Sequence, residues 1–141
     1  MALGFWMNNK NCYGCKTCSI ACKSEKQLNE GVLLRKVSCI RQDSPVNVSF
    51  LSMSCNHCED PACVKACPVE AYTKLDNGIV KQDHDKCIGC KMCISACPLG
   101  NMALDSCKVF KCTLCGGDPQ CAKYCPSGAI EYKSASPSSL V

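Results

Sequence analysis

The chain has 141 residues, and 18 of them are cysteine, about 13 % of the total, a content that by itself defines a class of protein. Hydrophobic residues reach 47 % only when cysteine is counted, and the apolar core is therefore thin and needs covalent or metal cross-links. The formal net charge is +4 with every cysteine counted as neutral. Since no stretch approaches the ~20 apolar residues of a membrane-spanning helix, no transmembrane segment is expected.

The elements predicted between the cysteines are short. The predicted strands, in chain order, cover residues 4–8, 46–53, 71–75, 79–82, 102–104 and 129–132. One helix is predicted over residues 16–28, beginning within the first run of cysteines. Asp76-Asn77-Gly78 predicts a hairpin turn, because Asn-Gly between two strand-like segments favours a tight turn. Residues 134–141 form a small polar tail, which we expect to be disordered or docked on a partner.

Sixteen of the cysteines fall into four groups of four. The first and third groups have the spacing CxxCxxCxxxC of bacterial ferredoxins, whereas the second and fourth have four and five residues before their third cysteine. Both insertions contain an Asp-Pro turn signal, which lets the loop bulge and still return its cysteine. The groups are Cys12, Cys15, Cys18 and Cys22; Cys55, Cys58, Cys63 and Cys67; Cys87, Cys90, Cys93 and Cys97; and Cys112, Cys115, Cys121 and Cys125.

This spacing predicts iron–sulfur chemistry. Three closely spaced thiolates wrap one cubane, while in two-cluster ferredoxins the fourth cysteine, which precedes proline, binds the other cluster. Proline follows the last cysteine in three groups, and Lys23 replaces it in the first. Sixteen ligands therefore predict four [4Fe–4S] clusters, with no open iron corner for substrate and no catalytic residues.

Zinc and disulfides are the alternatives to clusters. Zinc sites show isolated CxxC pairs separated by a finger, usually with histidine, so triplets ending in Cys-Pro do not fit. A disulfide framework needs an oxidising compartment, and residues 1–9 lack the features of a signal peptide. We therefore expect a cytoplasmic protein, with export in complex with a signal-bearing partner left open.

Three segments carry a resemblance to a known family: Ser54–Cys63 followed by Cys67-Pro68, then Asp85–Cys90, and Gly14–Cys18 followed by Ala21-Cys22-Lys23. They resemble the four-cluster electron-transfer subunit of the dimethyl sulfoxide reductase family of molybdopterin enzymes. The resemblance spans residues 4–132. It implies an α+β fold of tandem bacterial ferredoxin-like units, with short strands, short helices and many loops.

The resemblance also implies the domain organisation and the ligand sets. Residues 1–133 would form one compact domain, with an outer unit from residues 4–30 and 107–133 and an inner unit from residues 46–104. Each cluster would take three cysteines from one group and the last from another. The implied sets are Cys12, Cys15, Cys18 and Cys125; Cys112, Cys115, Cys121 and Cys22; Cys55, Cys58, Cys63 and Cys97; and Cys87, Cys90, Cys93 and Cys67.

The partner implied by the resemblance is a catalytic subunit that carries molybdopterin or tungstopterin, with a further redox partner. The protein would pass single electrons between the two. It also resembles small polyferredoxin subunits of tungsten aldehyde oxidoreductases, hydrogenases and carbon monoxide dehydrogenases. A second hypothesis is a free polyferredoxin with several client enzymes. Co-purification with one large pterin-binding subunit would favour the dedicated subunit over the free polyferredoxin. Members of the family that dock on a membrane subunit generally have a longer insertion in the fourth group and a longer C-terminal region than this sequence, so the resemblance implies no direct link to a membrane subunit.

Cluster binding changes the charge expected for the protein. Four clusters, each with four thiolates and a +2 core, add roughly −8 and bring the net charge near −4. No nucleic-acid partner is therefore expected. Lys16, Lys91 and Lys111 lie beside ligands and either offset cluster charge or are simply solvated.

A few residues outside the groups stand out. Cys39 and Cys107 are expected to be small buried residues rather than redox groups. His57 either donates a hydrogen bond to a cluster sulfur or packs, and His84 is expected at the surface. The aromatic pair Phe5-Trp6 is expected in the core or at a partner contact.

Overall fold

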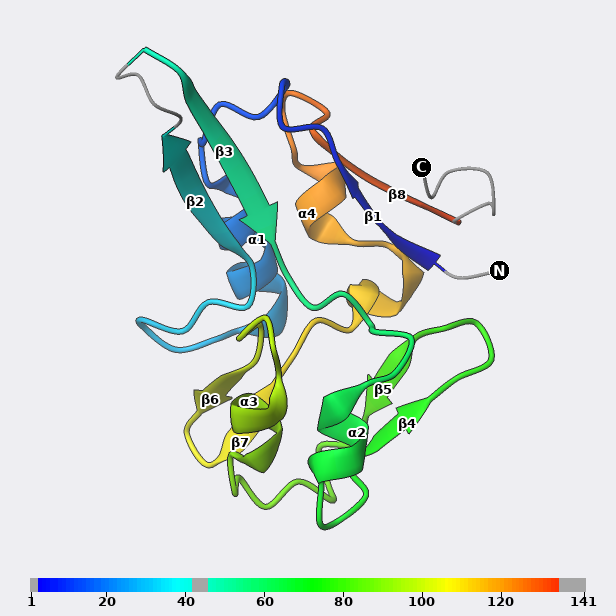
Figure 1. Cartoon of the computed structure of the whole chain (residues 1–141). Helices are drawn as coiled ribbons and strands as arrows, with labels where there is room; N and C mark the ends of the chain where they lie inside the picture. The colour runs from blue at the N-terminus through cyan, green and yellow to red at the C-terminus, as the bar shows by residue number, and fades with distance from the viewer. Residues whose placement is uncertain (1–2, 42–45, 135–141) are drawn as a thin grey trace.

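The computed structural model describes residues 3–41 and 46–134 (Figure 1). These residues form short helices and four two-stranded antiparallel sheets, a mixed α+β arrangement. The elements are β1 (Leu3–Met7), α1 (Thr17–Lys26), β2 (Lys36–Arg41), β3 (Val48–Met53), α2 (Ala62–Ala66), β4 (Tyr72–Lys74), β5 (Val80–Gln82), α3 (Met92–Ala96), β6 (Ala103–Asp105), β7 (Lys108–Phe110), the 3₁₀ turn η1 (Leu114–Gly117), α4 (Gln120–Lys123) and β8 (Ile130–Ser134).

Two halves can be distinguished in Figure 1. The terminal half, residues 3–41, 46–53 and 111–134, contains α1 packed against α4, and its strand β1 pairs with β8. The central half, residues 54–110, contains α2 packed against α3 and the hairpins β4–β5 and β6–β7. Strands from opposite ends of the sequence therefore close the terminal half, whereas the central half is built from one continuous segment.

Sulfur supplies much of the buried volume. In the central half, Ala71, Tyr72, Val80, Met102 and Val109 pack around Cys93, and four further cysteines of the second and third groups line the same cluster. In the terminal half the buried residues form two smaller clusters, one around Cys18 and Cys121 and one around Cys22. With so few large apolar side chains, these clusters cannot form an extensive core without the groups that the cysteines hold.

Polar contacts join the two halves. The backbone N–H and the Nδ2 atom of Asn29, which follows α1, donate to the Asp105 carboxylate at 2.9 and 2.5 Å. Within the central half, Asn101 Nδ2 donates to the Ser54 carbonyl oxygen at 2.6 Å. The Asn29 contacts therefore join the segment after the first cysteine group to the β6–β7 hairpin, which follows the third group.

The predicted elements largely match the structure. The helix predicted over residues 16–28 is confirmed as α1, and each of the six predicted strands overlaps an observed strand. Two strands, β2 and β7, were not predicted; β2 has six residues and pairs with β3, and β7 has three residues and pairs with β6. Ser134, placed in the polar tail by the sequence, is instead the last residue of β8, and the rest of that tail lies outside the described residues.

Candidate functional site

The residue before the second cysteine of each group has a left-handed backbone. These residues are Gly14, His57, Gly89 and Leu114, with φ of 75°, 47°, 71° and 55°. A left-handed residue reverses the direction of the backbone sharply, which curls the loop around the sulfur of the first cysteine. His57 N–H donates to Cys55 Sγ at 3.5 Å, and Leu114 N–H donates to Cys112 Sγ at 3.4 Å. The same turn thus recurs with glycine in the short loops and with a side chain in the long ones.

Two of the helices begin at a second left-handed residue. Lys16 precedes α1 with φ of 62°, and Lys91 precedes α3 with φ of 65°. The helices of the longer groups instead begin after the proline of the Asp-Pro insertions, Pro61 for α2 and Pro119 for α4. In all four groups the third cysteine lies within the first two residues of its helix, which turns its sulfur back toward the loop.

In the central half the structure brings together cysteines from different groups. One cavity is lined by Cys55, Cys58 and Cys63 of the second group and by Cys97 of the third. A second cavity is lined by Cys87, Cys90 and Cys93 of the third group and by Cys67 of the second. Each cavity is therefore surrounded by three cysteines of one loop and the last cysteine of the other.

In the terminal half the first and fourth groups approach each other in the same way. Burial raises the pKa of Cys22 to about 12, and charge on nearby thiols raises it as well. Those thiols are Cys112, Cys115 and Cys121 of the fourth group.

The remaining cysteines of the first group lie near Cys125. Burial raises the pKa of the Tyr13 phenol, and charge on Cys15, Cys125 and Cys12 acts in the same direction, so these three cysteines lie near the Tyr13 hydroxyl. Cys18 packs in a cluster with Cys121 and Cys125.

Hydrogen bonds at several cysteines favour the thiolate form. Several sulfurs accept backbone hydrogen bonds, including Cys67 Sγ from Ala71 N–H at 3.3 Å. Burial opposes ionisation of Cys125, but hydrogen bonds from Ile130, Ser127 and Ala129 lower the pKa of this thiol overall. Such hydrogen bonds stabilise the thiolate form that binds iron.

Within residues 3–41 and 46–134, no three His, Cys, Asp or Glu side chains are placed to hold one metal ion. All 18 cysteines are free thiols.

Comparisons with known proteins agree with this geometry. The family model of the 4Fe-4S dicluster domain matches residues 46–135. The B subunit of the anaerobic dimethyl sulfoxide reductase of Escherichia coli K12 is 40 % identical over 147 residues, an alignment that covers 92 % of the present protein and 72 % of that subunit. The protein belongs to the iron–sulfur subunits of the dimethyl sulfoxide reductase family.

Other relatives of this subunit serve different enzymes. The iron–sulfur subunit of formate dehydrogenase-O from Escherichia coli K12 is 34 % identical over 148 residues, covering 86 % of the present protein and 49 % of its own length. The iron–sulfur subunit of the arsenate respiratory reductase of Shewanella sp. ANA-3 is 38 % identical over 108 residues, covering 75 % of the present protein and 46 % of its own length. Electron transfer through [4Fe–4S] clusters is therefore the function of this subunit's family.

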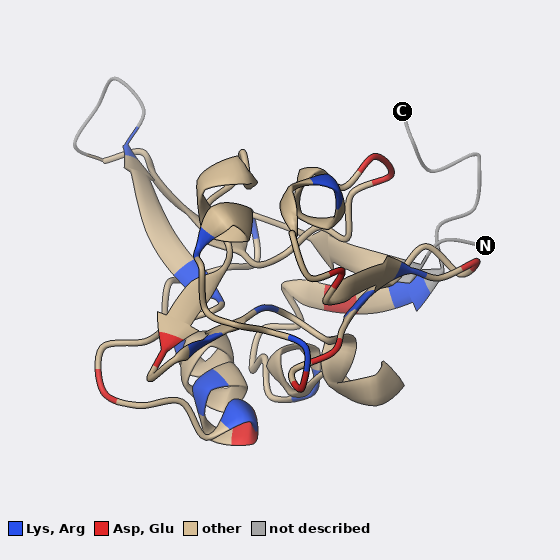
Figure 2. Ribbon diagram, turned by 90° about the horizontal axis from the view of Figure 1, so that it is seen from below, with Lys and Arg blue, Asp and Glu red and all other residues tan. Residues whose placement is uncertain are grey.

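The three lysines beside ligands differ in exposure. Lys16 and Lys91 are exposed, whereas Lys111 is only 1 % exposed. A second buried cation, Arg35, was not singled out from the sequence; its guanidinium donates to Ser52 Oγ at 3.0 Å and Ser54 Oγ at 2.8 Å, and it lies 4.5 Å from the centroid of the Phe5 ring. In the ribbon seen from below, Lys and Arg positions are interspersed along the backbone with Asp and Glu positions (Figure 2).

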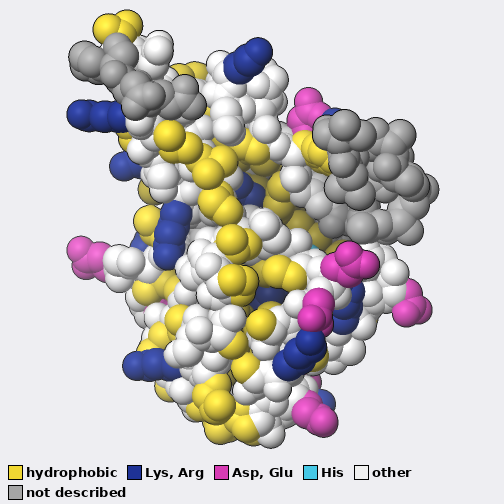
Figure 3. Space-filling view, viewed as in Figure 1, with side chains coloured by type: hydrophobic (Ala, Val, Ile, Leu, Met, Phe, Trp, Pro, Cys, Tyr) yellow, Lys and Arg dark blue, Asp and Glu magenta, His cyan; other side chains and the backbone are white. Residues whose placement is uncertain are grey.

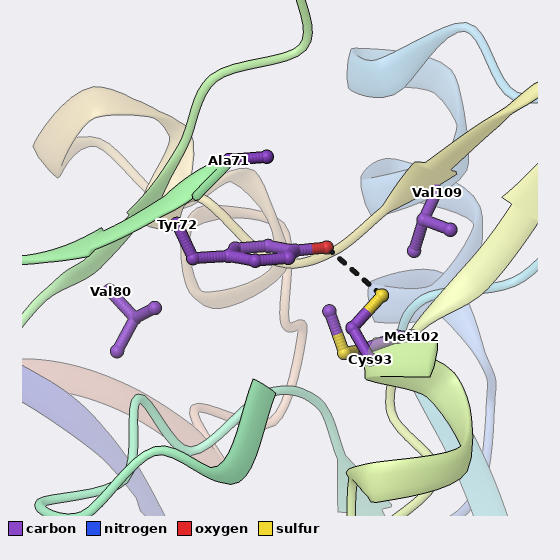
Figure 4. Packing of buried hydrophobic residues seen from close by; sticks show 6 residues of the cluster. All are labelled: Ala71, Tyr72, Val80, Cys93, Met102 and Val109. Atoms are coloured by element: carbon purple, nitrogen blue, oxygen red, sulfur yellow. Dashed lines mark hydrogen bonds between the residues drawn. The ribbon is translucent and has the colours of Figure 1, made fainter. Parts of the chain in front are cut away.

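Tyr72 is another residue that the sequence did not reveal as part of the site. Its ring lies across the central core from β4, and its hydroxyl donates to Cys93 Sγ at 3.3 Å (Figure 4). Burial and this hydrogen bond both raise the pKa of Tyr72 well above its ordinary value, so the hydroxyl stays protonated and remains a donor. Nothing in the short segment Tyr72–Lys74 marks this residue, because its partner lies 21 positions away.

The two histidines have structural environments. His57 is buried, and its Nδ1 accepts the Val80 N–H at 3.0 Å, so its ring packs while its backbone N–H contacts a cysteine sulfur. Burial, with help from the Lys111 charge, lowers the pKa of His57 to about 3. His84 is half-buried rather than at the surface, since its ring lies 4.7 Å from the Phe110 ring.

Two expectations for the other residues need correction or refinement. Cys39 and Cys107 were expected to be buried, and both are exposed; Cys39 lies on a strand that solvent reaches, and Cys107 lies in the turn between β6 and β7. Phe5 and Trp6 are half-buried: Phe5 packs 5.8 Å from Tyr132 between ring centroids, and Lys133 Nζ lies 5.4 Å above the Trp6 ring. In the part of the protein that the structure describes, no helix has the length and apolar character needed to cross a membrane.

Proposed function

We propose that the protein holds four [4Fe–4S] clusters and passes single electrons between a molybdopterin catalytic subunit and a second redox partner. When bound, each cluster accepts and releases one electron at a time. The sixteen ligands would be the cysteines of the four groups. Three cysteines of one loop and the last cysteine of its partner loop would hold each cluster.

The observation that carries this proposal is the crossing of cysteines between groups in the central half. The two cavities there are lined by complementary sets, one with Cys97 beside the second group and one with Cys67 beside the third. Two cubanes that exchange their fourth ligands require this arrangement. It supports Cys55, Cys58, Cys63 and Cys97 as one set and Cys87, Cys90, Cys93 and Cys67 as another.

The terminal half supports the other two sets. The Cys22 thiol is close enough to the fourth group to feel its charge, which favours the set of Cys112, Cys115, Cys121 and Cys22. The sulfurs around Tyr13 and the packing of Cys18 favour Cys12, Cys15, Cys18 and Cys125. With α1 on α4 and α2 on α3, the protein would be a tandem of two ferredoxin-like units within residues 1–133, the outer from residues 4–30 with 107–133 and the inner from 46–104.

The exposed parts of the loops favour exchange of electrons with partners at both ends of the molecule. Cys15 is exposed in the first group, and Cys90 is exposed in the third. Apolar side chains lie beside each of them, with Tyr13 57 % exposed and Ile88 63 % exposed. Figure 3 shows hydrophobic side chains scattered over one face, from the β2–β3 hairpin to the opposite end of the molecule. A partner that covers such a loop would bring its own redox group near an exposed ligand.

Metal analysis of anaerobically purified protein tests the proposal. We expect about sixteen iron and sixteen acid-labile sulfide per protein molecule, and interacting EPR signals on reduction. A large subunit containing molybdopterin or tungstopterin should co-purify. Zinc, or no metal, would contradict the proposal. Four clusters without a stable partner would favour a free polyferredoxin, and a partner of another kind would favour the hydrogenase or carbon monoxide dehydrogenase alternative.

The ligand crossing has its own test in Cys97→Ser. Because this residue lines the cavity of the second group, the substitution should perturb the cluster held by Cys55, Cys58 and Cys63 and spare the one built on its own loop. The matched control is Cys107→Ser, which changes an exposed thiol outside the groups and should leave all EPR signals intact. Loss confined to the Cys87 loop would refute the crossed assignment.

A further inference from the structure

Lys111 is an unusual residue because its whole side chain is buried. It is 1 % exposed and is the largest of the fully buried side chains among the described residues. Its Nζ donates to the carbonyl oxygens of Val80 at 2.7 Å and of Cys112 at 3.0 Å. These two acceptors are neutral, so they satisfy donors without balancing the charge. A lysine is rarely buried in this way without an anionic partner.

No acidic side chain supplies that partner among the described residues. The ion pairs found there are Lys65–Asp60, Lys123–Asp118 and Lys133–Glu131, and all six side chains are more than half exposed. The interior around Lys111 therefore contains a positive charge that no carboxylate within residues 3–41 and 46–134 neutralises. A buried ammonium in such surroundings is costly unless another negative group lies near it.

The second cysteine group offers the negative charge. Val80, whose carbonyl oxygen accepts from Lys111 Nζ at 2.7 Å, lines the same cavity as Cys55, Cys58, Cys63 and Cys97. The Val80 N–H also donates to His57, the residue before Cys58, so Lys111 is bonded to the wall of this cavity. Its hydrogen bonds reach β5 on one side and the first cysteine of the fourth group on the other, so it lies at the junction of the two halves.

We propose that Lys111 is the internal counter-cation of the cluster held by Cys55, Cys58, Cys63 and Cys97, and that its charge raises the reduction potential of that cluster. The inference rests on the proposed function, since it requires the cluster to be present. With four thiolates and a +2 core the site carries about −2, and reduction by one electron makes it about −3. A fixed positive charge stabilises the more negative state, and inside a protein this effect is stronger than at the surface.

The exposed lysines beside ligands should not have this effect. Lys91 follows the ligand Cys90 directly in sequence but is exposed at the start of α3. Water and salt screen its charge, whereas they do not reach Lys111. Proximity in sequence to a ligand is therefore not what gives a lysine influence over a cluster.

Redox titration monitored by EPR tests the proposal on the full-length protein loaded with clusters. Lys111→Met removes the charge and keeps the length of the side chain. We expect one cluster to become harder to reduce, with its one-electron equilibrium constant falling about tenfold, which corresponds to about 59 mV. Lys111→Arg keeps the charge and should leave the equilibrium constant at its original value. Lys91→Met should change the one-electron equilibrium constant of every cluster by less than about threefold. The cluster that shifts should be the one whose signal Cys97→Ser perturbs.

Lys111→Gln separates charge from hydrogen bonding. Its amide can still donate to the Val80 and Cys112 carbonyls, so this variant should fold even where Lys111→Met does not, and it should show the same shift. The shift should also persist as the salt concentration rises. Unchanged potentials in Lys111→Gln, or an equal shift in Lys91→Met, would overturn the proposal. A lack of iron in the unmodified protein would instead contradict the proposed function.

Discussion

The terminal and central halves form similar cysteine loops and cover them differently. Each half contains one short group with glycine at the left-handed position and one long group with a side chain there. In the central half the covering hairpins follow their groups directly, and their strands are three residues long. In the terminal half the strands are five or six residues long, and β1 and β8 come from opposite ends of the sequence.

The difference shows that the loop is a local structure, whereas its cover depends on long-range contacts. In the terminal half, β3 provides part of the cover: Ser52 Oγ lies 3.3 Å from Cys18 Sγ, and the Phe50 ring lies against Gly14. In the central half the covering residues come from the same segment as the cysteines. Substitutions at equivalent positions in the two halves should therefore have unequal effects, and such pairs test the comparison directly.

The largest difference is expected between Gly89→Ala and Gly14→Ala. A Cβ on Gly89 would collide with the Cys107 backbone carbonyl, which the β6–β7 turn holds in place, whereas a Cβ on Gly14 would lie 2.6 Å from atoms of the Phe50 ring. A ring can move more easily than backbone. Both variants carry the strain of a left-handed alanine, about 1–3 kcal/mol. We expect Gly89→Ala to prevent accumulation of loaded protein and Gly14→Ala to retain its iron with a lower melting temperature.

Iron content and thermal unfolding of the two purified variants distinguish these outcomes. In the double variant Gly14→Ala/Phe50→Ala, removal of the ring should relieve the steric contact at Gly14. Equal loss of iron in the two single variants would show that both loops are equally constrained. The statement that the two halves cover their loops differently would then be wrong.

The next comparison concerns the side chains at the left-handed positions of the long groups. Leu114→Ala and His57→Ala both keep a Cβ, so the backbone strain is unchanged and the difference reports packing. Leu114 is 1 % exposed, and its truncation should leave a cavity that costs about 2–5 kcal/mol. His57→Ala loses a smaller apolar contact and leaves the Val80 N–H without its acceptor, a loss of about 1–3 kcal/mol. Melting temperatures should fall further for Leu114→Ala, and the reverse order would contradict this interpretation.

The cysteine groups and most short elements could be predicted from sequence because their signals are local. A two-residue spacing, an Asp-Pro pair or an Asn-Gly turn acts within a few positions. The burial of Lys111 could not be predicted in this way, since Lys16 and Lys91 occur in equally close positions to ligands. Backbone conformation distinguishes the three lysines. Lys16 and Lys91 are exposed residues with left-handed φ that precede α1 and α3, whereas Lys111 follows β7 and is buried.

Other features were missed for the same reason. Arg35 contacts Ser52 of β3, Ser54 just after β3, and the Phe5 ring. None of these partners is near Arg35 in sequence. The exposure of Cys39 depends on which face of the β2–β3 hairpin packs against the rest of the molecule. Alternate residues of a strand point to opposite faces, and the sequence of this hairpin does not indicate which face is buried. Long-range packing decides both cases.

Tyr72→Phe tests whether hydrogen bonds to sulfur matter in the central half. The hydroxyl donates to Cys93 Sγ, so its removal should lower the reduction potential of the cluster that includes Cys93. This decrease should be smaller than the decrease that Lys111→Met causes in the cluster at Cys55, Cys58, Cys63 and Cys97. The loss of stability should be about 1 kcal/mol. The control is Tyr132→Phe in the terminal half, because the buried Tyr132 hydroxyl has no hydrogen-bond partner among the described residues. EPR titration should show no shift for the control, and a shift of similar size in both would contradict the assignment.

The smallest effects are expected where the two halves are most alike. Each long group carries an exposed ion pair five residues apart, Lys65–Asp60 at 2.6 Å and Lys123–Asp118 at 3.5 Å. Exposed pairs contribute under about 1 kcal/mol and weaken as salt screens them. Asp60→Asn and Asp118→Asn should therefore lower the melting temperature by a small and similar amount that vanishes at high salt. If one of the two variants instead lowers the melting temperature strongly, also at high salt, its Asp-Pro turn needs the carboxylate to shape the loop. The two long groups would then differ in the loop itself as well as in the residues that cover it.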